Sequence, residues 1–126
     1  MSEIVLRIPV PPSANRIWRR AGAIMHKSTE YRAWKDAAAA AIQEQRAGRC
    51  FDWFSIGIDL PHSRRDPDNS IKPILDACQA GGAVINDSRL RGMTLDVLDE
   101  PGEVVTVRLY EAAPRVEPKR SRKRAA

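Results

Sequence analysis

Residues 54–82 read FSIGIDLPHSRRDPDNSIKPILDACQAGG, and they predict a strand, an acidic loop and a helix in succession. Apolar residues alternate with small or polar ones over the first seven positions, which is the period of a strand. Proline is tolerated in a helix only within the first turn, so Pro73 places the start of the helix near Asn69 or Ser70. Gly81 marks its end.

The sequence on either side supplies the other elements of the predicted fold. We expect strands at about 4–10, 93–98 and 104–110, the last two joined as a hairpin, a helix at about 29–47, and an irregular basic loop at 13–27. Tyr31 and Trp34 share the apolar face of the first helix, where core packing is favoured over stacking on nucleic-acid bases. The pattern predicts an α+β domain with a mixed sheet of about four strands and two main helices packed on it.

Length and composition indicate one compact domain. The chain has 126 residues, of which 43% are hydrophobic and 29% charged, enough to bury one core without disulfides. We place this domain at residues 1–113 and expect 114–126 to be a basic, disordered tail. Cys50 and Cys78 lack the spacing of a zinc site, and both are expected to be reduced.

The net charge of +5 favours an anionic partner, either nucleic acid or an acidic membrane surface. Part of this excess lies in the tail, so charge alone does not distinguish a nucleic-acid-binding protein from a soluble basic one. No stretch is apolar enough to span a bilayer, and Glu3 and Arg7 are unlike a signal peptide. We therefore expect a soluble, cytoplasmic protein that does not enter membranes.

A group of carboxylates surrounds the predicted start of the second helix. Asp66 and Asp68 stand two residues apart in the loop, and Asp87 follows the next short apolar segment. Neighbouring carboxylates repel one another unless a cation neutralises them, and hard oxygen ligands suit Mg²⁺ or Mn²⁺. Backbone N–H groups at a helix start also favour a phosphate. These residues predict a divalent metal site beside a phosphate group.

Lys72 lies four residues after Asp68 and four before Asp76, so the three share one face of the helix. Two roles are open to it. It can orient the attacking water or stabilise charge that develops at the phosphate, or it can form an ordinary ion pair within the helix. Beside an acidic metal site the active role is favoured.

Simpler explanations of the acidic loop also exist. A helix cap at Asp68 or Asn69 would leave Asp66 unexplained. A calcium-binding EF-hand is excluded, because Ile71 stands where that loop needs glycine and Ala77 where it needs glutamate. An accidental acidic turn stays open, since two aspartates at this spacing are a weak signal alone.

Three motifs extend the context beyond the acidic loop. With x for any residue, they are Arg65-Asp66-x-Asp68-Asn69-x-x-Lys72-x-x-x-Asp76, Ala80-Gly81-x-x-x-Ile85-Asn86-Asp87-Ser88, and Pro11-Pro12-Ser13-x-Asn15-Arg16-x-Trp18-Arg19 with the later His26-x-Ser28. Together they resemble the RusA family of Holliday junction resolvases, endodeoxyribonucleases common in phages and prophages. The resemblance covers the chain from Ile4 to about Tyr110 and leaves out the tail.

The resemblance implies the roles of the site residues. It makes Asp66, Asp68, Asp87 and Lys72 catalytic, with the three aspartates holding Mg²⁺ or, as the alternative, Mn²⁺. It gives supporting positions to Asn69, Asp76 and Asn86. One departure stands out, because the family often has two adjacent acids where this chain has Asn86 and Asp87. The missing charge is expected to lower the affinity for the metal.

The resemblance also implies a function. We expect a homodimer, bacterial or phage-encoded, that resolves four-way DNA junctions in recombination and repair by paired symmetric nicks, because a two-fold dimer places identical sites on two strands of like polarity. A nuclease for other branched DNA and a non-catalytic DNA-binding protein are the alternatives. Side chains expected to contact the DNA are Asn15, Arg16, Arg19, Arg20, Arg64, Arg65, Arg89 and Arg91.

Overall fold

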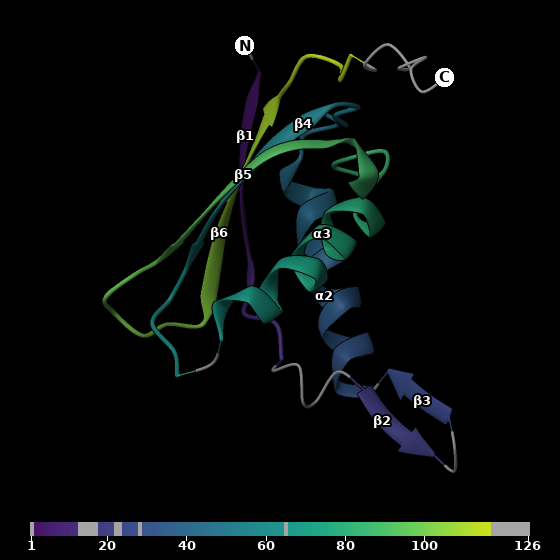
Figure 1. Ribbon diagram of the computed structural model, residues 1–126, viewed down its shortest axis with the longest axis vertical. Helices are drawn as coiled ribbons and strands as arrows, with labels where there is room; N and C mark the ends of the chain where they lie inside the picture. Colours follow the sequence, from purple (N-terminus) through teal and green to yellow (C-terminus); the bar gives the residue numbers. More distant parts are fainter. Residues whose placement is uncertain (1, 13–17, 22–23, 28, 65, 117–126) are drawn as a thin grey trace, which may run out of the picture.

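The fold is a four-stranded sheet with two helices on one face (Figure 1). The computed structural model describes residues 2–12, 18–21, 24–27, 29–64 and 66–116. The sheet strands are β1 (Glu3–Pro9), β6 (Val104–Glu111), β4 (Phe54–Leu60) and β5 (Leu90–Val97), in that spatial order. The helices are α2 (Thr29–Gln45) and α3 (Ile71–Ala80). The predicted α+β domain with a mixed four-stranded sheet is therefore confirmed.

The predicted alternation of side chains along the strands is also confirmed. In β1, Ile4, Leu6 and Ile8 are buried, while the residues between them are exposed. The buried side chains face the helices, so β1, β6 and β4 each present one apolar row to α2 and α3, whereas no residue of β5 is fully buried. Tyr31 and Trp34 lie in this core, 2% and 7% exposed, as predicted, and the Trp34 ring N–H donates to the carbonyl of Pro9.

Two predictions about the strands are wrong. The segments around 93–98 and 104–110 do not pair as a hairpin, because β6 lies between β1 and β4 while β5 pairs with the other edge of β4 in parallel. The turn between them crosses the end of β4, where His62 N–H donates to the Glu100 carbonyl and Leu98 N–H to that of Leu60. Turn residues predict that the chain reverses, but they do not determine which strand edges meet.

The second correction concerns the predicted loop at 13–27. Residues Trp18–Ala21 and Ile24–Lys27 form an antiparallel pair, β2 and β3, that projects beyond the start of α2 (Figure 1). Neither β2 nor β3 has a regular alternation of apolar and polar residues, so the sequence pattern does not predict that the two segments pair as strands. Asn15 and Arg16, predicted to contact DNA, lie outside the described residues.

A crossover through α3 joins the two parallel strands. The short 3-10 turn η1 (Pro67–Ser70) precedes α3, and a second one, η2 (Asp87–Arg89), follows it. Because Phe54 pairs with Leu90, η2 lies near the first residue of β4. The other turn, η1, follows the last residue of β4 and lies near the opposite end of that strand. The predicted helix is thus confirmed, and the fold places its two flanking turns at different ends of the strand pair.

The end of α3 is pressed against α2. A Cβ atom at Gly81 would lie 2.8 Å from the carbonyl oxygen of Ala39 and from Ile42, so only glycine fits at this position. In the ranges that the structure describes, no helix has the length and apolar character needed to cross a membrane.

Candidate active site

The first acidic turn is η1, and its cap is Asp66. The Asp66 carboxylate accepts the backbone N–H of Asp68 at 3.3 Å, and Pro67 occupies the first turn, where the missing N–H costs nothing. A cap is therefore present, but at Asp66 rather than at the Asp68 or Asn69 that the sequence suggested. Asp66 and Asp68 are both exposed.

The second acidic turn is η2, and Asn86 caps it. The Asn86 side-chain oxygen accepts the N–H of Ser88 at 2.9 Å. The backbone N–H of Asp87 donates to the side-chain oxygen of Gln79 on α3, also at 2.9 Å. Gln79 thus fixes the position of Asp87, a role that the sequence did not reveal because helix spacing alone cannot show what an exposed glutamine reaches.

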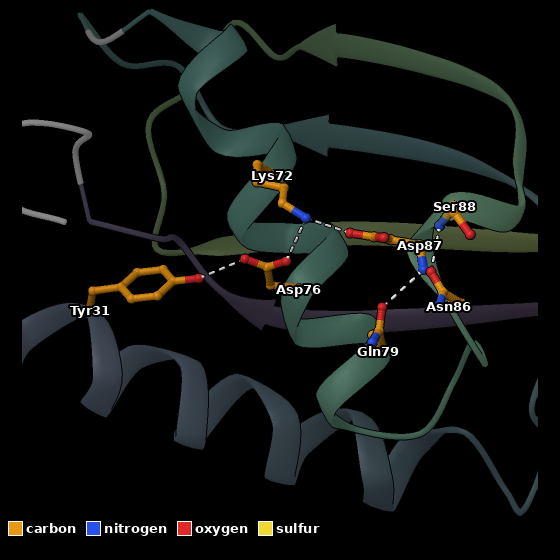
Figure 2. A network of polar contacts seen from close by, with 7 residues as sticks. All are labelled: Tyr31, Lys72, Asp76, Gln79, Asn86, Asp87 and Ser88. Atoms are coloured by element: carbon orange, nitrogen blue, oxygen red, sulfur yellow. Dashed lines mark hydrogen bonds and ion pairs between the residues drawn. The ribbon is translucent and has the colours of Figure 1, made fainter. Parts of the chain in front are cut away.

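Lys72 joins the helix to this second turn (Figure 2). Its Nζ lies 3.0 Å from Asp76 Oδ1 and 2.5 Å from Asp87 Oδ2. The ion pair within the helix and the long-range contact toward the acidic turn therefore occur together. The lysine side chain is 69% exposed, so these contacts contribute little to folding stability, and their value is positional.

Protonation at the centre of the network follows from these contacts. Hydrogen bonds to Asp87 and Asp76 raise the pKa of Lys72 above its ordinary value, so its ammonium is fully charged at neutral pH and is not a general base. Tyr31 donates its hydroxyl to Asp76 Oδ2 at 3.2 Å. Burial and the Asp76 carboxylate raise the pKa of Tyr31 to about 12, so it remains a donor to Asp76.

These groups border an open hollow between the two helices and η2, which we call the site hollow. Its lining residues are Lys35, Lys72, Asp76, Gln79, Ala80, Asn86 and Asp87. Asp76 and Asn86, predicted as supporting residues, are among them, whereas Asn69 lies in η1. Lys35, on α2, was not singled out from the sequence, because a lone lysine on a helix usually faces solvent.

The three aspartates predicted to share a metal ion lie in different surroundings. Asp87 lines the site hollow, whereas Asp66 borders a second, more apolar hollow formed with Val10, Leu60 and Val97. Within the part of the chain that the structure describes, no three His, Cys, Asp or Glu side chains are grouped closely enough to hold a metal ion. The shared metal site therefore stays a prediction.

The predicted DNA-contacting arginines also have varied surroundings. The Arg89 guanidinium lies over the Trp53 ring, 4.7 Å from its centroid, and 3.6 Å from the Asp52 carboxylate. Arg64 and Arg91 are exposed, and Arg19 and Arg20 lie on β2. Arg65 is outside the described residues. Contact with DNA stays a prediction for all of them.

Comparisons with known proteins give the chain its family. A family model described as "Endodeoxyribonuclease RusA" matches residues 9–118. The "Crossover junction endodeoxyribonuclease RusA" of Aquifex aeolicus (strain VF5) is 34% identical over 96 residues, which cover 70% of this chain and 75% of that protein. The match includes both acidic turns and the helix between them. This chain therefore belongs to the RusA family of endodeoxyribonucleases.

Proposed function

We propose that this protein is a divalent-metal-dependent endonuclease that resolves four-way DNA junctions by paired nicks. Membership of the RusA family supports the class of reaction and substrate. The observation that carries the proposal is the contact of Lys72 with both Asp76 and Asp87 in the site hollow. Asp68, in the other acidic turn η1, stands only four residues before that lysine. A cation and several carboxylates at a helix start suit phosphodiester hydrolysis.

The residues available suit Mg²⁺ or Mn²⁺. All three predicted ligands, Asp66, Asp68 and Asp87, offer carboxylate oxygens, the donors that these hard cations prefer. When bound, the ion acidifies a water molecule and neutralises charge on the phosphoryl oxygens. The exposed positions of Asp66 and Asp68 leave them accessible to an ion.

The chain's own residues supply positioning and charge. In this proposal, Lys72 donates to a phosphoryl oxygen or to the departing 3′ oxygen, where negative charge grows as the bond breaks. Asp76 and the Tyr31 hydroxyl hold the lysine from the side of the helix, and Gln79 holds the backbone of Asp87. Such preset geometry removes the need to reorder these groups during the reaction.

A homodimer completes the proposal. A four-way junction has approximate two-fold symmetry, so a two-fold dimer can present two identical sites to two strands of like polarity. The basic character of the chain, with a net charge of +5, favours binding to the phosphate backbone without sequence preference.

Cleavage of a synthetic four-way junction in the presence of Mg²⁺ tests this function. We expect symmetric nicks with 5′-phosphate and 3′-hydroxyl ends from the unaltered protein. An Asp68→Asn variant should bind the junction but not cut it. Asp96→Asn is the matched control, since Asp96 is exposed on β5 and pairs with Asp59 of β4 rather than with either acidic turn.

The possible outcomes separate the alternatives. Binding without cleavage by the unaltered protein would favour a non-catalytic DNA-binding module. Faster cleavage of flapped or three-way substrates than of the four-way junction would assign the enzyme to other branched DNA.

A further inference from the structure

Lys35 occupies a position on α2 that faces α3. Four residues before it, the Tyr31 hydroxyl donates to Asp76 of α3, and four residues after it, the Ala39 carbonyl meets the backbone at Gly81. Residues four apart lie on the same side of a helix, so the contacts on both sides of Lys35 place it toward the same neighbour. Lys35 accordingly lines the site hollow beside Gln79 and Ala80.

A lysine is an unusual residue at a position where one helix packs on another, because its charge must reach water or a partner. Lys35 is only partly exposed. The carboxylates that line the hollow, those of Asp76 and Asp87, both contact Lys72. Within the described ranges, no ion pair to Lys35 is formed, so its ammonium is left to water or to an incoming ligand in the hollow.

We propose that the Lys35 ammonium binds a backbone phosphate of the DNA strand that enters the site hollow. This inference rests on the proposed function and deepens it by adding a substrate-binding residue from α2, a helix outside both acidic turns. An ammonium is a point charge with three donors, which suits a phosphate oxygen and carries no base preference. Lys35 thus binds the DNA strand, while Lys72 stabilises negative charge at the phosphate whose bond is cleaved.

The test compares the effect of Lys35 substitutions on junction binding with their effect on the cleavage rate. Lys35→Gln removes the charge, and Lys35→Arg keeps it. Arg7→Gln is the matched control, because Arg7 lies on the face of the sheet away from both helices and its replacement changes the net charge equally. Binding is measured with a fluorescent four-way junction in a buffer without divalent ions, at several salt concentrations.

We expect Lys35→Gln to weaken junction binding about tenfold, the effect of losing one charged hydrogen bond. The slope of the logarithm of affinity against the logarithm of salt concentration should fall by about 0.9, as for one phosphate contact. Arg7→Gln should change affinity by less than about twofold, and Lys35→Arg should restore most of the loss. In cleavage assays, Lys35→Gln should raise the junction concentration needed for half-maximal cleavage more than it lowers the rate at saturating junction and Mg²⁺.

A chemical measurement supports the same assignment independently. Bound junction should protect Lys35 from acetylation, as mass spectrometry of the digested protein would show, even if Lys35→Gln folded poorly. Equal affinity and salt slope for Lys35→Gln and Arg7→Gln, or labelling of Lys35 unchanged by DNA, would overturn the inference. Absence of cleavage by the unaltered protein would contradict the proposed function alone, because the binding and protection results remain readable; absence of both cleavage and junction binding would overturn both.

Discussion

The two acidic turns on either side of α3 have the same local construction. Each is a single 3-10 turn capped by the residue before it, with Asp66 accepting the N–H of Asp68 in η1 and Asn86 accepting that of Ser88 in η2. An amide oxygen caps as well as a carboxylate does, and it brings no charge. The departure at Asn86 therefore preserves the turn while removing one negative group.

The turns differ in what lies beyond them. In η1, Asp66 and Asp68 are exposed, whereas in η2 the backbone of Asp87 is held by Gln79 and its carboxylate by Lys72. Local sequence thus builds both turns, but only tertiary contacts fix an acid in a defined place. An acid held by a lysine has a preset position, and an exposed acid is free to meet an incoming ion.

The largest effect should come from Asp87→Asn, which tests whether the two turns serve one site. We expect the cleavage rate at saturating Mg²⁺ and junction to fall about 10³-fold, because a charged group is lost where negative charge is transferred. The free energy of unfolding, measured in urea, should change by less than about 0.5 kcal/mol, since the exposed lysine keeps Asp76. Normal cleavage by this variant would show that η2 takes no part in the chemistry.

The same contrast explains how much of the fold was predictable. The alternation in β1 and β4 and the helical spacing before Gly81 depend on neighbours in the sequence, and both were predicted correctly. The partner of β5 depends instead on which strand edge is free when the sheet assembles. The turn at 99–102 reads the same whether the chain pairs with itself or crosses β4.

For the candidate site, the sequence predicts residues that belong to a motif but not the residues that hold them in place. Residue types and spacing predict Asp66, Asp68, Lys72 and Asp87 as the catalytic residues, and their roles stay a prediction. Gln79, by contrast, acts through a backbone N–H eight residues away, and no pattern of side chains carries that information. Motifs predict the groups that do chemistry, whereas a group that holds one of them in place, such as Gln79, becomes visible only in the folded chain.

Gln79→Ala should release the backbone of Asp87 in η2 while leaving η1 unaltered. Loss of its acceptor leaves the Asp87 N–H without this partner, which should cost about 1 kcal/mol of unfolding free energy. We expect the cleavage rate to fall about tenfold as Asp87 loses its fixed position. Gln43→Ala, at an exposed position of α2, is the control, and an equal effect of both variants would show that Gln79 does not position η2.

Tyr31→Phe removes the most buried member of the network, and its cost in folding stability should be largest below pH 10. Because the pKa of Tyr31 is raised from 10.0 to about 12, the folded state favours the protonated hydroxyl. This contribution to stability is complete below pH 10 and is lost as the pH rises toward 12. The variant should lose about 1 kcal/mol at neutral pH and show a weaker fall in unfolding free energy over that alkaline range.

The control for that prediction is Tyr110→Phe, at the chain's other tyrosine, which is exposed on β6. The pKa of Lys72 is also raised in the folded protein, so the unfolded chain loses that proton at a lower pH, and part of the alkaline decline should persist in Tyr31→Phe. If the free energy of unfolding depended on pH identically in the two phenylalanine variants, the Tyr31 hydroxyl would have no stabilising contact with Asp76.

The smallest effect should come from Asn86→Asp, which makes η2 resemble η1 most closely. Asparagine and aspartate cap equally well, so the free energy of unfolding should change by no more than about 0.3 kcal/mol, whereas Asn86→Ala should cost about 1 kcal/mol through loss of the cap. The added carboxylate lines the site hollow beside Asp87, where it should lower the Mg²⁺ concentration needed for half-maximal cleavage. A metal requirement equal in Asn86→Asp and the unaltered protein would mean that residue 86 only shapes the turn, and that the difference in charge between the two turns has no bearing on metal binding.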